Sequence, residues 1–341
     1  MTTVITKRLG YLAAAERLLR ALGPVEYCPD QRPETVRRHL AGARIVLATK
    51  GVTIDGDALD AAPGLRVVAA PTAGFDWIDI TAATARGIPV IANTGAAADA
   101  VAEFTLGTVL ALTRRIVAAD RELRGGADWA AVRDRYSRAD LRIGGDLTTS
   151  TVAIVGLGHI GRKVAQKLAV LRPATLIGYD PFLPAAHAAE LGVELCADLL
   201  DCVRRADVLL LHVPLTARTA GLVGAEVLAA LPPRALLVNC SRGEVVDEPA
   251  LVEALESGRI AGAALDVFAE EPLPVDSPLR RLDNVILTPH IAGVTAQSDE
   301  TRAREIGERV LAAAAGTRPV GLVNPEVWDN RRPFDGPLEP K

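Results

Sequence analysis

The segment TVAIVGLGHIGRKVAQKL, residues 151–168, constrains the fold of this chain more than any other feature. Gly156, Gly158 and Gly161 stand in G-x-G-x-x-G spacing, directly after an apolar strand pattern and directly before a helical pattern. In this setting the first glycine allows a tight turn, the second lets the backbone approach a pyrophosphate, and the third lets the helix pack closely on the strand. The N-terminus of the helix attracts the anion. The segment therefore predicts a strand–loop–helix unit that binds a dinucleotide.

The acidic residue that ends the next strand pattern indicates which dinucleotide is bound. The run TLIGYD ends at Asp180, 19 residues after Gly161, close to the offset of about 20 expected for a carboxylate that binds the adenosine ribose. Such a carboxylate accepts hydrogen bonds from both ribose hydroxyls and repels a 2′-phosphate, and the next residues, Pro181-Phe182-Leu183, offer no arginine. The sequence favours NAD over NADP. The alternative is that Asp180-Pro181 only starts a turn.

Short apolar strand patterns alternate with helical patterns before and after this unit. Those before it are VIT, VEY, IVLA, LRVVAA and PVIAN, and those after it are ATLIGYD, VLLLHV, ALLVNCS, GAALDV and NVILTPH. Such alternation is typical of βαβ units, which build parallel sheets. The 341 residues also exceed what one hydrophobic core usually serves. We therefore predict an α/β protein of two lobes, each a doubly wound parallel sheet, with a cleft between them.

The segment 100–123 has the pattern of one helix that is apolar on nearly all sides. A helix of this kind is buried on more than one face. The pattern alone leaves three roles open: packing in the core of a lobe, bridging the lobes, or lining a dimer interface.

Composition and charge narrow the choice of partners. The net charge is −4, and no basic run gives the electrostatic footprint of a nucleic-acid or membrane surface. The apolar runs are much shorter than the ~20 residues that span a bilayer, and the start lacks the apolar segment of a leader. The four cysteines, Cys28, Cys196, Cys202 and Cys240, lack CxxC pairing, so we expect free thiols rather than disulfides or a metal site. A cytoplasmic protein with a small-molecule partner is predicted.

Three polar residues follow apolar strand patterns in the second half of the chain. Arg242 follows ALLVNCS, Glu271 follows GAALDVF, and His290 ends NVILTPH. Because ligands of open α/β sheets bind at the carboxyl ends of the strands, we expect the three side chains to lie at one edge. An imidazole beside a carboxylate can donate the proton that carbonyl reduction needs, and a guanidinium can grip a carboxylate with two hydrogen bonds. Each residue alone also fits a structural role, but their shared position favours catalysis.

Five longer motifs carry a further signal: GLGHIG, HVPLTARTAGLVG, NCSRGEVVDEPALVEAL, GAALDVFAEEP and TPHIAG. In this order and at this spacing, over roughly residues 60–325, they resemble the D-isomer-specific 2-hydroxyacid dehydrogenase family. The resemblance implies a flavodoxin-like substrate domain made of residues 1–97 and 294–341, and a Rossmann NAD domain of residues 98–293. It also implies a homodimer and NAD-dependent reduction of a small 2-keto acid, such as glyoxylate, hydroxypyruvate, phosphohydroxypyruvate or a phosphonate analogue.

The resemblance also assigns roles to single residues. Arg242 would bind the substrate carboxylate and keto oxygen, and His290 would act as acid and base with Glu271 as its orienting partner. Backbone N–H groups of Ala73 and Gly74 would bind the substrate carboxylate. In addition to the three glycines and Asp180, the cofactor would meet His159 and Ile160 at the pyrophosphate and His212, Val213, Pro214 and Thr219 on the adenosine side. Cys240 and Asp266 would lie by the nicotinamide carboxamide, and the other predicted cofactor contacts are Ser241, Arg242, His290 and Gly293.

Departures from the family pattern leave the substrate open. Thr72 stands where many relatives carry glycine, and Ala97 stands where several carry asparagine. Thr149-Ser150 replace a Gly-Lys pair, a change that we interpret as structural. A phosphite-type dehydrogenase and a non-catalytic NAD-sensing protein similar to co-repressors of this fold remain alternatives. Formate dehydrogenases of the superfamily carry glutamine in place of Glu271, and L-lactate-type enzymes place the glycine motif near the N-terminus, so both are disfavoured.

Overall fold

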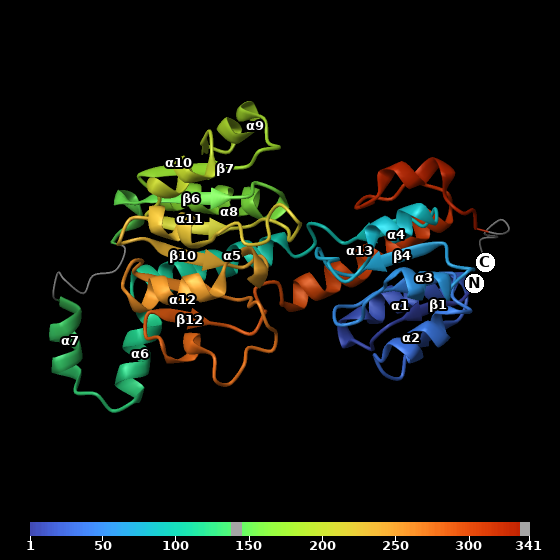
Figure 1. The fold of residues 1–341 in the computed structure, drawn as a ribbon, viewed down its shortest axis with the longest axis horizontal. Helices are drawn as coiled ribbons and strands as arrows, with labels where there is room; N and C mark the ends of the chain where they lie inside the picture. Colours follow the sequence, from blue (N-terminus) through green and yellow to red (C-terminus); the bar gives the residue numbers. More distant parts are fainter. Residues whose placement is uncertain (138–144, 335–341) are drawn as a thin grey trace. The chain divides into compact units, whose positions relative to one another are not determined.

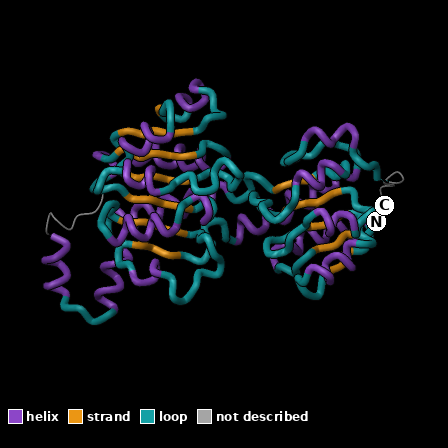
Figure 2. Tube along the Cα trace, in the orientation of Figure 1, coloured by secondary structure: helices purple, strands orange, loops and turns teal. Residues whose placement is uncertain are grey.

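The computed structural model describes residues 1–137 and 145–334, which divide into two compact units. One unit combines Met1–Ala97 with Val294–Lys341, and the other is Ala98–Gly293. Each unit contains one sheet in which all strands are parallel, with helices on both faces (Figures 1 and 2). The predicted α/β class with two parallel sheets is therefore confirmed.

The sheet of the first unit has the strand order β2-β1-β3-β4-β5. The strands are β1 Thr3–Ile5, β2 Val25–Tyr27, β3 Ile45–Leu47, β4 Val67–Ala70 and β5 Val90–Ala92. Because successive side chains of a strand point to opposite faces, the sheet has two apolar layers. Val4, Val46 and Val68 pack against one set of helices, α2 Pro33–Leu40, α3 Gly56–Asp60 and α4 Ile80–Ala85. Ile5, Leu47 and Val67 pack against α1 Ala13–Leu19 and α13 Ala296–Ala314.

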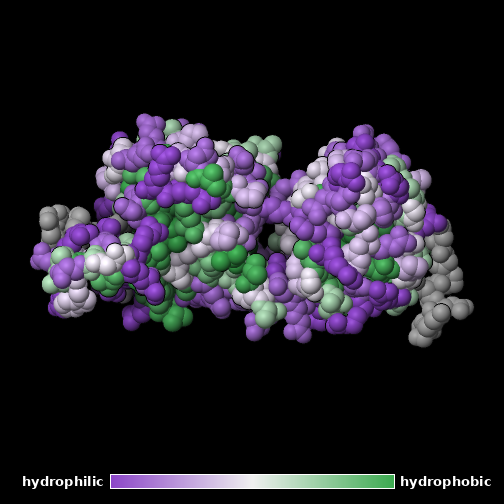
Figure 3. All heavy atoms as spheres, turned by 90° about the horizontal axis from the view of Figure 1, so that it is seen from below, coloured by the Kyte–Doolittle hydropathy of each residue, from purple (hydrophilic) through white to green (hydrophobic). Residues whose placement is uncertain are grey.

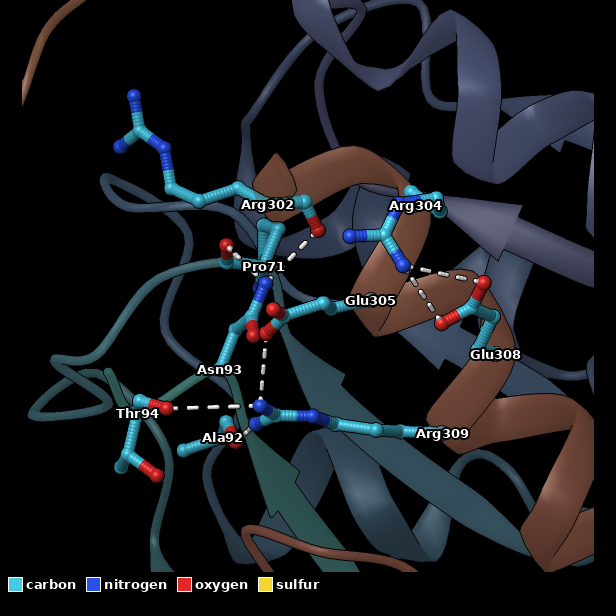
Figure 4. Close-up of polar contacts among 9 residues, drawn as sticks. All are labelled: Pro71, Ala92, Asn93, Thr94, Arg302, Arg304, Glu305, Glu308 and Arg309. Carbon is cyan, nitrogen blue, oxygen red and sulfur yellow. Dashed lines mark hydrogen bonds and ion pairs between the residues drawn. The ribbon is translucent and has the colours of Figure 1, made fainter. Parts of the chain in front are cut away.

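Polar contacts fix α13 to the end of β5 (Figure 4). The Arg309 guanidinium donates to the carbonyl of Ala92 at 2.8 Å and pairs with Glu305 at 2.9 Å. Asn93 Nδ2 donates to the carbonyl of Arg302 at 2.7 Å. The bonds to Ala92 and from Asn93 join positions more than 200 residues apart in sequence, so they tie α13 into the N-terminal sheet, whereas the Glu305 pair orients Arg309 within α13.

The sheet of the second unit has the order β12-β11-β10-β9-β6-β7-β8. Its strands are β6 Thr151–Val155, β7 Thr175–Tyr179, β8 Glu194–Leu195, β9 Val208–Leu211, β10 Leu236–Asn239, β11 Gly262–Leu265 and β12 Val285–Leu287. One face is covered by α5 Ala98–Thr113, α8 His159–Leu171 and α9 Ala185–Glu190, and the other by α10 Leu199–Arg204, α11 Ala225–Ala230 and α12 Glu248–Glu256. The strand order reverses between β6 and β9, and such a reversal opens a ligand crevice at the carboxyl edge.

The single helix predicted over residues 100–123 is wrong. The structure contains two helices, α5 and α6 Ile116–Arg124, followed by α7 Trp129–Ser137. The break lies at Arg115, whose backbone is left-handed with φ of 51°. α5 packs in the core of the second unit through Val101, Ala102 and Val109, whereas α6 has no buried residue. The prediction failed because the apolar pattern continues past Arg115, where the chain leaves the core.

Among the described residues, no helix combines the length and apolar character that crossing a bilayer requires. All four cysteines are buried and free.

Candidate functional site

The three residues predicted to be catalytic lie at one edge of the second sheet. Arg242 comes three residues after the end of β10, Glu271 six residues after the end of β11, and His290 three residues after the end of β12. These strands are neighbours in the sheet and run parallel, in the register Asn239 to Leu265 and Leu265 to Leu287. Their carboxyl ends therefore present the three loops side by side.

His290 and Glu271 form a direct pair. The imidazole Nδ1 lies 3.0 Å from Glu271 Oε1 and 2.9 Å from Oε2, although 19 residues separate them in sequence. The His290 and Glu271 side chains are 34% and 25% exposed, so solvent screens the pair only in part. A carboxylate at Nδ1 fixes the ring orientation and makes Nδ1 the donor, so Nε2 is the ring nitrogen that is chemically able to exchange a proton with a ligand.

Asp266 holds the loop that carries His290. Its carboxylate, only 2% exposed, accepts hydrogen bonds from Thr288 Oγ1 at 2.6 Å, Ile291 N at 2.9 Å and Ala292 N at 2.8 Å. Its backbone carbonyl accepts His290 N at 2.8 Å. His290 itself has a left-handed backbone with φ of 56°, a conformation that costs a non-glycine residue about 1–2 kcal/mol. The four hydrogen bonds offset this cost.

This supporting role of Asp266 was not predicted from the sequence, from which we expected contact with the nicotinamide carboxamide. The signal was an acidic residue directly after the apolar strand GAAL, a position at which a carboxylate must be either solvated or bonded by neighbouring loops. The structure places Asp266 among backbone N–H groups, and the predicted contact with a cofactor stays a prediction.

The glycine loop after β6 has the geometry expected for dinucleotide binding. Gly156 has φ of 91°, and a Cβ there would lie 2.6 Å from the carbonyl oxygen of His212. A Cβ on Gly161 would lie 2.0 Å from the carbonyl oxygen of Gly156, so neither position accepts a side chain. A Cβ on Gly158 would meet nothing within 4 Å, and Gly158 is the N-cap of α8. An anion thus has open access to the first backbone N–H groups of this helix, at His159 and Ile160.

Asp180 is fixed at the end of β7 beside this loop. Its Oδ2 accepts the backbone N–H of Leu157 at 2.8 Å, and its Oδ1 accepts that of Phe182 at 2.9 Å. Each carboxylate oxygen keeps further acceptor capacity. The side chain is thus held against the glycine loop in an orientation that can receive two vicinal hydroxyls.

The remaining predicted cofactor residues are distributed over the same edge. His212, Val213 and Pro214 follow β9, and Val213 Cγ1 would lie 2.8 Å from a Cβ on Gly156. Thr219 Oγ1 donates to the carbonyl of Pro214 at 2.6 Å and so closes the loop after β9. Cys240 and Ser241 follow β10 and are buried, and burial raises the pKa of the Cys240 thiol to about 12. Gly293 ends the unit.

The residues predicted to bind substrate through their backbone lie in the first unit, after β4. Ala73 is exposed and Gly74 is half-buried. Thr72 Oγ1 donates to the carbonyl of Gly74 at 3.0 Å, which holds the loop in a tight turn. Among the described residues, no group of histidine, cysteine and acidic side chains has an arrangement that could hold a metal ion.

The His212 side chain is buried. Neither ring nitrogen has a hydrogen-bond partner among the described residues, and burial lowers the pKa of the ring from 6.5 to about 4. Between pH 6.5 and about pH 4, the unfolded chain therefore binds a proton at this histidine that the folded protein does not bind. The free energy of unfolding falls as the pH drops through this range. Lowering the pH from 7 to 5 should cost about 2 kcal/mol of unfolding free energy at this site alone.

Urea unfolding at pH 7 and pH 5 measures this cost, with His212→Gln as the matched variant. The variant should lose about 2 kcal/mol less than the wild type between the two pH values. An equal pH-dependent loss in both proteins would show that His212 is not the group responsible.

Comparisons with known proteins give similar sequences and a similar fold. Residues 106–292 match the family model described as "D-isomer specific 2-hydroxyacid dehydrogenase, NAD binding domain". The chain is 40% identical over 299 residues to the glyoxylate reductase of Thermofilum pendens, covering 88% of this chain and 86% of the relative. It is 36% identical over 310 residues to the D-3-phosphoglycerate dehydrogenase of Methanocaldococcus jannaschii, covering 91% of this chain but only 57% of that longer relative.

A solved structure is similar over nearly the whole chain. The NADPH-dependent glyoxylate/hydroxypyruvate reductase of Sinorhizobium meliloti, in complex with NADP and malonate, matches with a TM-score of 0.81 at 27% identity. The match covers 94% of this chain and 96% of that one.

Proposed function

The chain belongs to the D-isomer-specific 2-hydroxyacid dehydrogenase family, and from this premise we propose that it is an NAD-dependent oxidoreductase that interconverts a small 2-keto acid and its D-2-hydroxy acid. The observation that carries the proposal is the His290–Glu271 pair at 3.0 and 2.9 Å, on the same sheet edge as Arg242. A cation to bind an anionic substrate and an acid to protonate an oxygen are the two groups that reduction of a 2-keto acid demands from the protein.

We assign one task to each side chain. Arg242 binds the carboxylate and polarises the adjacent keto group. His290 donates its Nε2 proton to the keto oxygen during reduction and takes it back during oxidation. Glu271 stabilises the imidazolium form and keeps the ring oriented. Gly158, His159 and Ile160 would hold the pyrophosphate of NAD, and Asp180 the adenosine ribose; the bound nicotinamide supplies or accepts the hydride. Ala73 and Gly74 remain our predicted backbone contacts to the substrate.

The proposal is tested by following NADH absorbance with a panel of 2-keto acids: glyoxylate, hydroxypyruvate, phosphohydroxypyruvate and a phosphonate analogue. We expect turnover with at least one of them and none with a ketone that lacks the carboxylate. Phosphite with NAD⁺ is included because phosphite oxidation is compatible with the same three residue types. Turnover of phosphite but of none of the keto acids would show that the substrate is phosphite rather than a 2-keto acid. Binding of NADH without turnover of any compound would favour an NAD-sensing protein.

Asp180 supports NAD rather than NADP, in contrast to the NADPH-dependent Sinorhizobium enzyme. Asp180→Asn keeps the side-chain shape and an acceptor for Leu157 N but removes the charge that repels a 2′-phosphate. We expect the ratio of kcat/KM with NADH to that with NADPH to fall by about 10-fold to 100-fold, which is the effect of 1.4–2.7 kcal/mol of lost repulsion. An unchanged ratio would exclude Asp180 as the discriminating residue.

We also propose a homodimer in which α6 and α7 contribute to the interface. These helices belong to the second unit and expose large apolar side chains: Ile116 is 55% exposed, Leu123 43% and Trp129 61%. Figure 3 shows hydrophobic residues gathered on the face of the second unit that is turned to the viewer. Light scattering should give twice the chain mass of 35.9 kDa. Trp129→Glu should yield a monomer, whereas Val275→Glu, at a residue that is 90% exposed in the same unit, should not. A monomeric wild-type protein would contradict the proposal.

The predicted cytoplasmic location stays a prediction.

A further inference from the structure

Asn239, which the sequence analysis did not single out, is the last residue of β10 and is 1% exposed. Its side chain makes three hydrogen bonds within the loop that carries Arg242. Oδ1 accepts the backbone N–H of Ser241 at 3.0 Å and the Ser241 hydroxyl at 2.7 Å, and Nδ2 donates to the carbonyl of Arg242 at 2.8 Å. Because an N–H must meet the oxygen and a carbonyl must meet the nitrogen, these partners define the amide orientation.

These bonds fix the peptide group next to Arg242. The Ser241 N–H and hydroxyl are both bonded to Asn239, and the Ser241 carbonyl accepts the Arg242 guanidinium through Nη1 at 2.7 Å. Asn239 thus holds both the backbone of Arg242 and the residue on which its side chain rests. The Asn239 carbonyl in turn accepts Asp266 N at 3.0 Å, which joins this loop to the strand end that supports His290.

The far end of the Arg242 loop is held by close packing. A Cβ on Gly243 would lie 1.9 Å from the carbonyl carbon of Phe268, so the loop after β10 lies directly against the loop after β11. Arg242 therefore stands between two fixed points, Asn239 on one side and Gly243 on the other. Only the first of them is a side chain that can be changed without a steric clash.

We propose that Asn239 is a positioning residue that orients the Arg242 guanidinium for the substrate carboxylate, an inference that rests on the proposed function. Asn239 touches neither substrate nor cofactor in this proposal and acts through Arg242. Its loss should therefore weaken recognition of the carboxylate while binding of NADH remains unchanged.

The test uses Asn239→Ala, Asn239→Asp, Arg242→Ala and the double variant Asn239→Ala/Arg242→Ala. Asn239→Asp keeps the acceptor for Ser241 but cannot donate to the Arg242 carbonyl when ionised. We expect either change at Asn239 to lower kcat/KM about 10-fold to 100-fold, as expected for a buried group left unsatisfied beside a functional loop. In the Arg242→Ala background, Asn239→Ala should change kcat/KM less than 2-fold, because the residue through which it acts is gone.

The matched control is Asn324→Ala in the first unit. Asn324 is also 1% exposed, accepts Val90 N at 2.8 Å and donates to the carbonyl of Ile88 at 3.0 Å. It therefore reports the effect of removing a buried amide of a similar bonding pattern that makes no hydrogen bond to the Arg242 loop. We expect kcat/KM to stay within 2-fold of the wild type. An equal loss in Asn239→Ala and Asn324→Ala would overturn the proposal in favour of a general effect of destabilisation.

Two binding measurements separate failure of this inference from failure of the proposed function. Calorimetry with oxamate, an unreactive analogue of a 2-keto acid, should show about 10-fold weaker binding to Asn239→Ala in the presence of NADH, with NADH affinity unchanged within 2-fold. Absence of turnover in the wild type would sink the proposed function itself. Wild-type turnover combined with full additivity of the Asn239 and Arg242 effects would overturn only the positioning role.

Discussion

Replacing His290 with glutamine should lower kcat for keto-acid reduction by about 10³-fold, which corresponds to about 4 kcal/mol of activation free energy. Glutamine has similar reach and can still bond Glu271, but it cannot exchange a proton. The substrate oxygen would then take its proton from water, in a geometry that the protein does not control. The affinity for NADH, measured by fluorescence titration, should change little because the hydride donor is bound by other loops. Retention of a tenth or more of the wild-type kcat would contradict the role of His290 as the acid.

The pH profile gives an independent check on His290. Reduction consumes the proton of the imidazolium form, so kcat/KM for the keto acid should fall with rising pH. Oxidation of the hydroxy acid needs the neutral ring, so its kcat/KM should rise over the same range. His290→Gln should flatten both profiles, and a profile of unchanged shape would assign the titration to another group.

Glu271→Gln serves as the control for the pairing itself. The substitution keeps a hydrogen-bond acceptor near His290 Nδ1 but removes the charge that favours imidazolium. We expect a loss of about 30-fold in kcat, smaller than that of His290→Gln. The double variant should be no less active than His290→Gln alone, because Glu271 acts through the imidazole.

The family and the two parallel sheets were predictable from sequence because both depend on local patterns. Apolar runs of strand length alternate with helical patterns, and the glycine spacing at Gly156, Gly158 and Gly161 has a physical meaning in each position. The approach of His290 to Glu271 was also accessible, since the carboxyl ends of parallel strands share an edge. Their distance of about 3 Å was not, because it depends on two loop conformations.

The residues that shape those loops could not be predicted, since their partners lie in other loops. Asp266 bonds Thr288, Ile291 and Ala292, more than twenty residues downstream, and no pattern in GAALDV indicates that its carboxylate holds a left-handed histidine. Asn239 bonds to residues only two and three positions away, yet an asparagine after a strand is equally typical of an ordinary turn.

The helix break at Arg115 shows the limit of periodicity. Residues 100–123 contain no proline, and their one glycine, Gly107, lies inside α5 rather than at the break. A left-handed arginine costs free energy that only the surrounding packing offsets. Arg115 stacks on the Tyr136 ring at 5.3 Å, a contact between α7 and the start of α6 that depends on the tertiary structure.

Replacing Arg242 with alanine should lower kcat/KM for the keto acid by about 10³-fold, with most of the change in KM and part in kcat. Each charge-assisted hydrogen bond to a carboxylate contributes about 1.5–3 kcal/mol, so loss of a two-pronged contact removes about 4 kcal/mol of transition-state stabilisation. Arg242→Lys is the matched control, since it keeps the charge but loses the planar fork. It should recover about 10-fold to 100-fold of the lost kcat/KM.

The same pair of variants discriminates between recognition of the carboxylate and general electrostatic steering. If Arg242 only raised the local concentration of anions, lysine would restore nearly full activity, and the remaining dependence on charge would weaken at high salt. If the guanidinium grips the carboxylate, the difference between arginine and lysine should persist at high salt, because a desolvated contact is screened little. If Arg242→Ala kept kcat/KM within 10-fold of the wild type, another group would have to bind the substrate carboxylate. The backbone N–H groups of Ala73 and Gly74 would then be the leading candidates.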